Sequence, residues 1–379
     1  MKITVAIDSF KGSLSSFEAG NAVREAALSV DLDNEVFVCP MADGGEGTVE
    51  AMCNAMNGTI ISVEVQGPLD NKVDAQYAIL EDGLTAVIEM SAAAGITLIC
   101  EQDRNPLYTT TYGVGEIIKD AISRGCRKFI VGIGGSATND GGTGMLKALG
   151  YKFLDHSGND IPLGAIGLKD LAFIETDGVL AELSNCSFRI ACDVKNPLCG
   201  ENGCSAIYGP QKGADEKMIA DMDLWLKNYS EITKTVSSKA DADYEGTGAA
   251  GGLGFAFLSF TNAVLQSGID IVLDETGLEE KIKLSDLVVT GEGRLDGQSV
   301  MGKAPIGIAR LAKKHGKSVI AFSGCVTDDA VVCNDCGIDA FFPILRQVVS
   351  LQEALNKENA YKNLKQTAEQ VFRLIKIKK

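Results

Sequence analysis

The segment of this chain best equipped to bind an anion runs over residues 134–142, GGSATNDGG. It follows Lys128–Ile133, an apolar β-branched run that predicts a buried strand, and precedes a helix expected over Met145–Leu149, which Gly150 should end. Glycines let the backbone approach a ligand closely, and free N–H groups at a helix N-terminus point at it. Polar side chains in the turn add donors and a carboxylate for a metal ion: Ser136, Thr138, Asn139 and Asp140. The alternative is a tight turn whose glycines serve geometry alone.

The chain is strongly acidic, with a formal net charge of -16. This charge argues against a nucleic-acid partner, because binding to a duplex needs clustered lysines and arginines. It also repels a polyphosphate, so a phosphate site must carry its own cations, backbone donors and a metal ion. The chain does place single cations inside glycine-rich turns, namely Lys11, Lys212, Arg294 and Lys303.

Two strand–turn–helix units open the chain and predict a parallel α/β sheet. The strand expected over Lys2–Ile7 ends at Asp8, and the capping-box spacing of Ser15 and Glu18 predicts the start of a helix. The strand Glu35–Cys39 leads into a second glycine-rich turn, PMADGGEGT, and a helix over about 48–56. Ligands of such sheets lie beyond the carboxyl ends of the strands. Four charged residues fall there: Asp8, Lys11, Asp43 and Glu46.

Two more carboxylates follow predicted strands. Asp193 ends the strand Ser187–Cys192 beside Asn196, a setting that suits a general base or a metal ligand, and equally an aspartate that starts a turn. Asp296, in the glycine-rich turn after the strand Asp286–Thr290, is its rival for either role. A third glycine-rich turn, EGTGAAGGLG at 245–254, precedes an apolar helix expected over 255–266.

Several familiar motifs are incomplete here. Two segments match the dinucleotide pattern G-x-G-x-x-[GA], from Gly132 and from Gly246, but neither has the βαβ context that the motif requires. Residues 297–304 nearly match a P-loop and lack its magnesium-binding hydroxyl. Cys333 and Cys336 have no partner pair for a structural zinc site, and the two histidines are isolated. Chemistry must therefore rest on carboxylates, lysine and arginine.

Alternating strands from Thr59 onward predict an antiparallel section, and the α/β pattern resumes near Leu284. The simplest layout is one α/β domain built from both ends of the chain, residues 1–66 and 284–379, with residues 67–283 inserted between them.

Composition describes an ordinary globular protein of 379 residues, 45% hydrophobic and 23% charged. No apolar run is long enough to span a membrane, and the N-terminus has no features of a signal peptide. The eleven cysteines are scattered and odd in number, which favours reduced thiols and a cytoplasmic location.

In order along almost the whole chain, eight segments resemble the type I glycerate kinases of bacteria. The segments are DSFKGSLS from Asp8, PMADGGEGT from Pro40, TYGVGE from Thr111, GGSATNDGGTGMLKALG from Gly134, DVKNPLCG from Asp193, YGPQKGA from Tyr208, GAAGGLG from Gly248 and TGEGRLDGQSVMGKAP from Thr290. The resemblance implies ATP- and Mg²⁺-dependent phosphorylation of D-glycerate, with 2-phosphoglycerate favoured over 3-phosphoglycerate. It also implies a Rossmann-like parallel-sheet domain with a second, inserted α/β domain.

The roles within these segments are our own assignments, made from side-chain chemistry. We expect ATP to be bound by Gly134, Gly135, Ser136, Thr138, Asn139, Lys212, Gly251, Gly252 and Lys303. We expect D-glycerate to be bound by Asp8, Ser9, Lys11, Asp43, Gly44, Gly45, Glu46 and Arg294. Catalysis is assigned to Asp193, Asp296 and Lys11, and magnesium to Asp193, Asp140 and Glu292. These roles suit phosphoryl transfer, which needs positioning and charge neutralisation more than covalent chemistry.

Two other functions remain open on sequence alone. One is an NAD-dependent dehydrogenase, and the other is a small-anion binding protein without catalysis. The expected partner is a small molecule, with no nucleic acid and no membrane, and the protein is a monomer or a homodimer.

Overall fold

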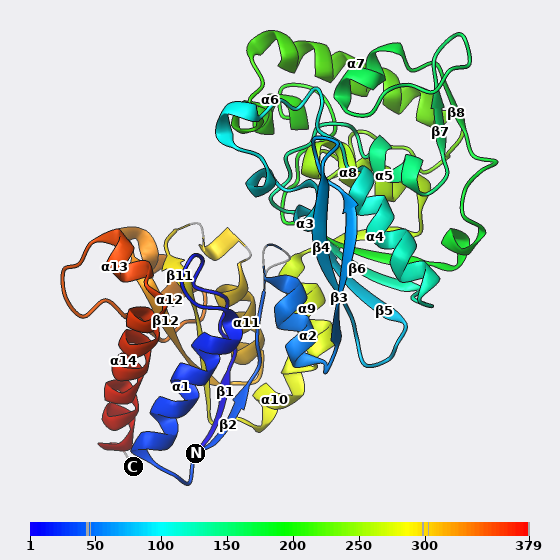
Figure 1. Cartoon of the computed structure of the whole chain (residues 1–379). Coiled ribbons are helices and arrows are strands. Elements are labelled where there is room, and N and C mark those ends of the chain that lie inside the picture. The colour runs from blue at the N-terminus through cyan, green and yellow to red at the C-terminus, as the bar shows by residue number, and fades with distance from the viewer. Residues whose placement is uncertain (43–44, 46, 298, 302, 378–379) are drawn as a thin grey trace. The chain divides into compact units, whose positions relative to one another are not determined.

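The computed structural model describes residues 1–42, 45, 47–297, 299–301 and 303–377, and the chain forms two compact units (Figure 1). The first unit comprises Met1–Asp43, Glu50–Met56 and Ile269–Lys379, and the second comprises Gly44–Val49 and Asn57–Gly268. The fold is α/β with mostly parallel sheets. Every helix in the described part of the chain is too short or too polar to cross a membrane.

The first unit is built on a five-stranded sheet that is parallel throughout, in the order β13-β12-β11-β1-β2. Its strands are β1 (Lys2–Val5), β2 (Glu35–Val38), β11 (Leu287–Leu295), β12 (Ser318–Val326) and β13 (Ala340–Pro343). Its helices are α1 (Ser16–Val30), α2 (Thr48–Ala55), α9 (Gly268–Thr276), α10 (Leu278–Leu284), α11 (Ala304–Lys314), α12 (Val332–Asp335), α13 (Leu351–Leu355) and α14 (Lys357–Ile377). This is the Rossmann-like arrangement, with strands from both ends of the chain in one sheet.

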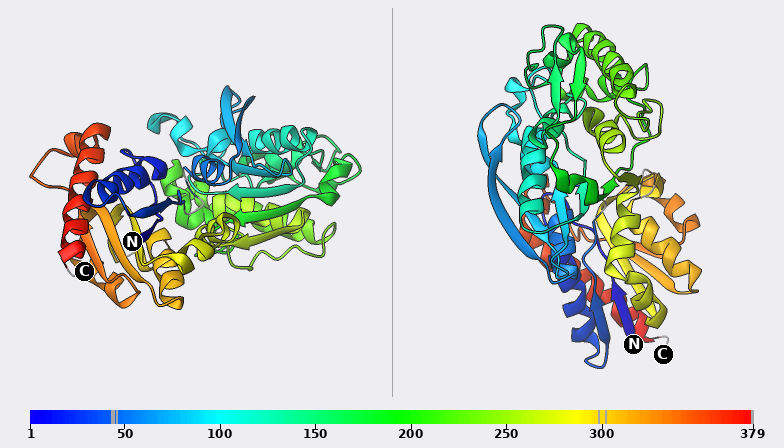
Figure 2. Two further views of the ribbon diagram at one scale, coloured as in Figure 1. Left: turned by 90° about the horizontal axis from the view of Figure 1, so that it is seen from below. Right: turned by 90° about the vertical axis from the view of Figure 1, so that its right-hand side faces the viewer.

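Helix α1 begins where the sequence predicts. The Ser15 hydroxyl accepts a hydrogen bond from the Glu18 amide, and the Glu18 carboxylate accepts one from the Ser15 amide, so the capping box is complete. Helix α14 lies beside α1 at the edge of this unit, as the red and blue helices of Figures 1 and 2 show. Their apolar faces share one core with β1 and β11, because Val23, Leu364 and Val289 are all fully buried in the same cluster.

The second unit holds a six-stranded mixed sheet in the order β10-β9-β6-β5-β4-β3. Its strands are β3 (Thr59–Gln66), β4 (Lys72–Ile79), β5 (Thr85–Glu89), β6 (Lys128–Gly132), β9 (Ser187–Ala191) and β10 (Ala263–Gln266), and a separate pair is formed by β7 (Lys152–Leu154) and β8 (Phe173–Glu175). Strands β3 to β5 are antiparallel, as predicted, and β5, β6, β9 and β10 run parallel.

The helices of this unit are α3 (Ser91–Ala94), α4 (Tyr112–Ser123), α5 (Thr143–Ala148), α6 (Cys204–Tyr208), α7 (Glu216–Lys234) and α8 (Ala249–Phe260). The core of the unit is rich in aromatic side chains. Phe129 of β6 stacks on Phe188 of β9 with ring centroids 4.7 Å apart, and Phe257 of α8 packs against Phe188. The central strands are therefore fixed rigidly beneath the loops that follow them.

Two predictions of secondary structure are wrong. The apolar run 255–266 is not one helix, because α8 ends at Phe260 and residues 263–266 pair with β9 as a strand. A short apolar run does not distinguish a buried strand from a helix. The second concerns Gly291–Asp296, predicted as a turn. Most of it continues β11, since Glu292 and Arg294 stay in register with Ser323 and Cys325 of β12.

The bounds of the two units differ from the predicted domain limits at both junctions. Residues 57–66 belong to the second unit, because β3 pairs along its whole length with β4. Residues 269–283 belong to the first unit, where Ile269 lies against the position of Gly307 in α11. The predicted limits at 66/67 and 283/284 rest on the change of sequence pattern alone and stay a prediction.

Candidate active site

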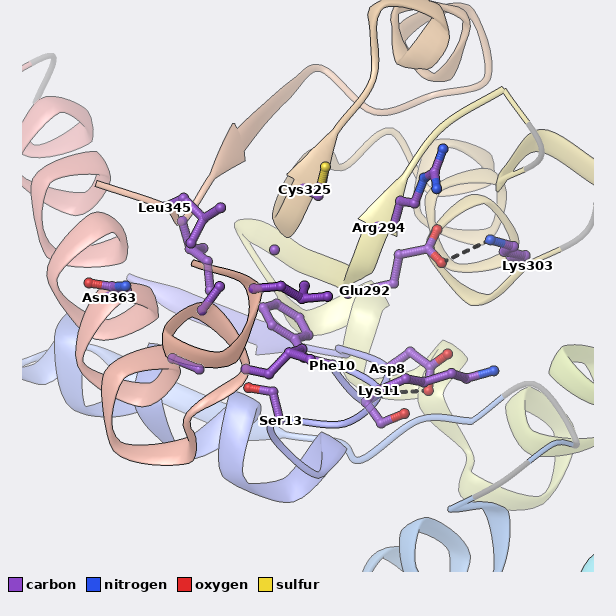
Figure 3. Close-up of a pocket in the computed structure, with 18 residues that line it drawn as sticks. Asp8, Phe10, Lys11, Ser13, Glu292, Arg294, Lys303, Cys325, Leu345 and Asn363 are labelled. Carbon is purple, nitrogen blue, oxygen red and sulfur yellow. Dashed lines mark hydrogen bonds and ion pairs between the residues drawn. The ribbon is translucent and has the colours of Figure 1, made fainter. Parts of the chain in front are cut away.

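A pocket of about 330 Å³ lies in the first unit, over the carboxyl ends of β1, β11 and β12 (Figure 3). One end of the pocket carries charged side chains and the other carries apolar ones. The charged end is formed by Asp8, Lys11, Glu292, Arg294 and Lys303. All five were singled out from the sequence, so the fold gathers in one place residues that are almost 300 positions apart.

The turn after β1 is held against β11 by backbone contacts. The Asp8 amide donates to the Gly291 carbonyl at 3.0 Å, and the Asp8 carboxylate accepts from the Ser9 amide at 2.6 Å. A Cβ on Gly293 would lie 3.3 Å from the backbone nitrogen of Lys11, which is a tight contact, so the turn packs closely against β11 at this glycine. Asp8 itself is buried, with 5% of its surface exposed.

Glu292 lies at the floor of the charged end, 7% exposed. Its Oε1 accepts a hydrogen bond from the Ser299 hydroxyl at 2.6 Å, and its Oε2 lies 3.3 Å from Nζ of Lys303. Burial raises the pKa of Glu292, and the hydrogen bond from Ser299 and the charge of Lys303 oppose that rise. The carboxylate is therefore held in place, and its charge is sensitive to what enters the pocket.

Arg294 extends toward solvent and is held at its base by a second carboxylate. Its Nε lies 3.1 Å from Oδ2 of Asp296, and the Asp296 amide donates to the Ser299 hydroxyl at 3.2 Å. Asp296 is not among the residues that line the pocket. Because Asp296 pairs with Arg294, we interpret it as a residue that orients Arg294, and this makes it a weaker candidate for the general base.

The second unit presents its own carboxyl edge, formed by β5, β6, β9 and β10. Gly134 and Gly135 follow β6 there and are exposed, and Gly135 adopts a left-handed conformation with φ of 73°. A Cβ on Gly134 would lie 3.6 Å from the Cα of Gly45, so Gly45 of the turn PMADGGEGT lies next to the turn over 134–142. Asp43, Gly44 and Glu46, predicted to bind substrate, lie outside the described residues.

The rest of the 134–142 turn is buried. Asp140 is completely enclosed, and its oxygens accept hydrogen bonds from the amides of Thr111, Gly142 and Gly144 and from the Thr111 hydroxyl. Burial raises its pKa, and these hydrogen bonds act in the opposite direction. The contacts join the starts of α4 and α5. They leave no free oxygen surface, so the geometry disfavours Asp140 as a metal ligand.

Lys212 lies beneath the same turn, 2% exposed. Its ammonium donates to the Ser136 hydroxyl at 2.9 Å and to the Thr138 carbonyl at 2.6 Å. Burial lowers the pKa of Lys212 to about 8. Lys212 therefore holds the shape of the turn from below. Lys212 was expected to bind ATP, but its side chain is buried within the second unit and contacts this turn.

The buried polar atoms of the turn include two without a hydrogen-bond partner among the described residues, the Thr138 hydroxyl and Oδ1 of Asn139. The amide nitrogen of Asn139 donates to the Ser205 hydroxyl at 2.9 Å. Both residues are fully buried, so the direct contact with ATP predicted for Thr138 and Asn139 has no support in the geometry.

The third glycine-rich segment packs against the first. Ala250, Gly251 and Gly252 all have positive φ, of 52°, 67° and 92°. A Cβ on Gly251 would lie 2.0 Å from the Thr138 carbonyl oxygen, and one on Gly252 would lie 2.7 Å from the Cα of Gly141. Gly251 and Gly252 are buried by this contact, which disfavours the predicted role in binding ATP.

Asp193 follows β9 and is exposed at the carboxyl edge of the second unit, as predicted. Its Oδ1 accepts a hydrogen bond from the Gly268 amide at 3.1 Å. Asn196 was expected to orient Asp193. Its side chain instead donates a hydrogen bond to the Asn202 carbonyl and accepts one from the Tyr208 hydroxyl. Asp193 is therefore positioned by the chain that follows β10.

Sequence reasoning missed Glu89, the last residue of β5. Strand register places Glu89 opposite Gly132 of β6, and Gly132 opposite Ala191 of β9. Glu89 and Asp193 thus flank the Gly134 turn at the same sheet edge, two strand spacings or roughly 10 Å apart. The Glu89 carboxylate accepts a hydrogen bond from the amide of Val49, which also belongs to the second unit, at 2.9 Å. The sequence signal that could have identified Glu89 is an apolar strand that ends in a carboxylate.

The cysteines and histidines of the described residues do not gather into a metal site. All eleven cysteines are free, as expected from the scattered spacing. The described residues include no group of three or more potential ligands that could hold a metal ion. His315 contacts Glu279 at 2.7 Å on the surface of the first unit, where α10 meets α11.

Comparison with known proteins identifies the family. A family model described as "Glycerate kinase family" matches residues 3–376. The chain belongs to the glycerate kinase family. It is 46% identical to a glycerate kinase of Haemophilus influenzae over 378 residues, covering 100% of both chains, and 48% identical to a glycerate 2-kinase of Escherichia coli, covering 96% of this chain and 95% of the relative.

A solved structure from Salmonella typhimurium LT2, described as a glycerate kinase 2, superimposes with a TM-score of 0.92 at 44% identity, covering 100% of this chain and 98% of that one. The resemblance found in the eight sequence segments is thereby confirmed. The chain is that of an enzyme, a kinase, and a kinase uses ATP as phosphate donor. The dehydrogenase and the non-catalytic binding protein have no support from these relatives.

Proposed function

We propose that this protein transfers the γ-phosphoryl group of ATP to D-glycerate and forms 2-phosphoglycerate. The observation that carries the proposal is the match to the glycerate kinase family over residues 3–376. One curated relative is named a glycerate 2-kinase, which favours the 2-hydroxyl as the acceptor. The geometry supplies groups for both substrates.

The charged end of the pocket in the first unit suits the phosphates of ATP. Lys11, Arg294 and Lys303 line one pocket, although sequence reasoning had divided them between glycerate and ATP. Three cations together match a polyphosphate better than a single carboxylate. Charge-assisted hydrogen bonds to phosphate oxygens are about twice as strong as neutral ones, and phosphoryl transfer depends on neutralising these charges.

Magnesium fits the same end of the pocket. Mg²⁺ is commonly held by one or two carboxylates together with substrate phosphates, and it does not need a cage of protein ligands. Asp8 and Glu292 meet this requirement, because Asp8 follows β1, Glu292 lies in the neighbouring strand β11, and both line the same pocket. The ion would neutralise charge on the phosphate oxygens. Asp140 is left out of this proposal because its oxygens are fully engaged.

The carboxyl edge of the second unit suits D-glycerate. The exposed backbone of Gly134 and Gly135 can offer N–H groups to a carboxylate, as glycine-rich turns after a strand do. Asp193 and Glu89 flank the turn and can accept hydrogen bonds from hydroxyl groups. We assign to Asp193 the proton of the attacking hydroxyl, since it is exposed and its backbone is held by β9.

The test is a coupled assay of ADP formation with D-glycerate, followed by phosphorus NMR of the product. ATP-dependent turnover with a 2-phosphoglycerate signal is expected. A 3-phosphoglycerate signal would correct the position of transfer, and absence of turnover with D-glycerate and Mg·ATP would overturn the proposal. Oxidation of glycerate with NAD in the absence of ATP would favour the dehydrogenase.

The free thiols of the chain bear on the compartment in which the enzyme works. Eleven free cysteines, most of them buried, suit a reducing compartment, and we therefore propose a cytoplasmic enzyme. Light scattering after gel filtration will distinguish the expected monomer or homodimer from a larger assembly.

A further inference from the structure

We infer that the apolar end of the pocket in the first unit binds the adenine and ribose of ATP. This assignment deepens the proposed function and rests on it. The leucines of this end, Leu345, Leu351 and Leu355, lie outside the eight segments singled out in the sequence. The site is formed by the chain after β13 and by α13 and α14, and the phosphates would extend from it toward Lys11, Arg294 and Lys303.

The pocket has two chemically different ends. Figure 3 shows Leu345 and Asn363 at one end and Arg294, Glu292 and Lys303 at the other, with Cys325 between them. Its volume of about 330 Å³ is at the lower end of the range of small-molecule sites. A ligand that fills it must combine an apolar body with an anionic tail, and a nucleotide has this composition.

The apolar wall is unusually exposed. Leu345, Leu351 and Leu355 line the pocket and are 41%, 75% and 40% exposed, although they lie close together. A flat ring that covers them would bury apolar surface, at a gain of roughly 25 cal/mol per Å². D-glycerate is small and polar throughout, so it gives these leucines nothing to pack against.

Polar atoms are present beside the apolar wall. The Ser13 hydroxyl is buried and has no hydrogen-bond partner among the described residues, and it belongs to the pocket lining. Asn363 of α14 is half-buried and lines the same end. A hydroxyl and an amide supply both donors and acceptors, which suit the nitrogen-rich edge of adenine. Small-molecule sites combine an apolar lining with a few such polar groups.

The first test uses two cysteines of the chain as reporters. Cys325 is exposed and lines the pocket, and Cys100 is exposed, belongs to the second unit and is not a lining residue of the pocket. Alkylation by iodoacetamide is followed at both thiols by mass spectrometry, without ligand, with Mg·ADP and with D-glycerate. With ADP at about ten times its Kd, alkylation of Cys325 should slow roughly tenfold, because only the free protein reacts. Cys100 should react at an unchanged rate.

The second test separates the base from the phosphates. Leu351→Gln and Leu355→Gln should weaken ADP binding roughly three- to tenfold, measured by calorimetry, because each removes apolar contact with the base. Binding of inorganic tripolyphosphate, which has no base, should stay unchanged. Leu224→Gln is the matched control, since Leu224 is a 64% exposed leucine of α7 that does not line the pocket.

The outcomes distinguish this inference from the proposed function. Turnover of ATP and D-glycerate with unprotected Cys325 and an unchanged KM for ATP in both leucine variants would overturn the base site and leave the kinase intact. Protection of Cys325 by ADP in a protein that does not phosphorylate D-glycerate would support the base site and overturn the proposed acceptor. Protection by D-glycerate in place of ADP would overturn the base site.

Discussion

Nζ of Lys303 lies 3.3 Å from Oε2 of Glu292 (Figure 3). The other oxygen of that carboxylate accepts a hydrogen bond from the Ser299 hydroxyl at 2.6 Å. Burial raises the pKa of Glu292 above its usual 4.5. As pH falls through the raised pKa, the carboxylate gains a proton and loses its attraction for Lys303 and for a magnesium ion. Activity that depends on the charged form should therefore decline at a higher pH than an ordinary glutamate would cause.

Glu292→Gln should remove this acidic limb from the pH profile of kcat/KM and lower the activity at neutral pH by at least about tenfold, as expected for a lost charge-assisted contact. The Mg²⁺ concentration for half-maximal rate should rise. Profiles from pH 5 to 8 at several Mg²⁺ concentrations check both effects. Glu279→Gln is the control, since Glu279 is a half-buried glutamate of the same unit that does not line the pocket. An unchanged profile in Glu292→Gln would remove Glu292 from the site.

Lys11→Ala should lower kcat/KM for ATP about ten- to a hundredfold, because a charge-assisted hydrogen bond contributes roughly 1.5–3 kcal/mol. Lys11 is exposed on the turn after β1 and is free to reach an anion in the pocket. Steady-state kinetics with each substrate varied in turn will measure the effect. Lys152→Ala removes an exposed lysine of β7 and should have no effect. A loss below about twofold in Lys11→Ala would contradict the assignment.

Asp193→Asn keeps the shape of the side chain and removes its charge. If Asp193 accepts the proton of the glycerate hydroxyl, kcat should fall on the order of 10²–10⁴-fold with KM nearly unchanged. If it holds magnesium, a raised Mg²⁺ concentration should restore part of the rate. Asp296→Asn should act through Arg294 and raise the KM for ATP. Near-normal kcat in Asp193→Asn together with an inactive Asp296→Asn would transfer the role of base to Asp296.

Gly135→Val should raise the KM for D-glycerate, because Gly135 has φ of 73° and a β-branched residue is strained there. Space is available, since a Cβ would lie 3.6 Å from the Cβ of Ser91, so the protein should fold. The turn would lose the close backbone approach to an anion. Gly158→Val, at an open surface position with φ of 79°, carries the same strain elsewhere and is the control. A raised KM for ATP alone would return the turn to the nucleotide phosphates.

Lys212→Met should change the pH dependence of stability. The folded pKa of about 8 lies below the ordinary 10.5, so between these values the unfolded chain holds more protons than the folded one. The free energy of unfolding of the unmodified protein should therefore rise, relative to Lys212→Met, as pH increases from about 8 to 10.5. Denaturant titrations at pH 7, 8, 9 and 10 measure this. Parallel curves for the two proteins would contradict a depressed pKa.

The sequence predicted those parts of the site that depend on local pattern. The strands before the glycine-rich turns at 40–48 and 134–142, the capping box of α1 and the carboxylate after β9 were all found where expected. Asp8, Lys11, Glu292, Arg294 and Lys303 meet in one pocket because parallel strands bring their carboxyl ends to one edge. That rule needs only the order of the elements.

Other parts could not be predicted, because they depend on contacts between distant residues. Glu89 gains its partner, the Val49 amide, from 40 positions away. Gly251 and Gly252 look like ligand-binding glycines in the sequence. In the structure, glycine is required there because a Cβ would clash with Thr138 or Gly141. The leucines of the apolar wall come from the chain after β13 and from α13, and they follow no motif. A glycine-rich segment indicates that its backbone lies close to another group. That group can be a ligand or another segment of the chain.

The contact of Gly251 with Thr138 also constrains the order of folding. The turn over 134–142 is supported from outside by residues 246–254 and by Lys212, which are synthesised much later. During translation the turn cannot reach its final shape until about 110 further residues have left the ribosome, and contacts between such distant segments form slowly. The glycerate side of the enzyme should therefore be among the last parts of the second unit to mature. A nascent chain that ends before residue 246 should keep the strand β6 but leave the turn after it open to proteolysis.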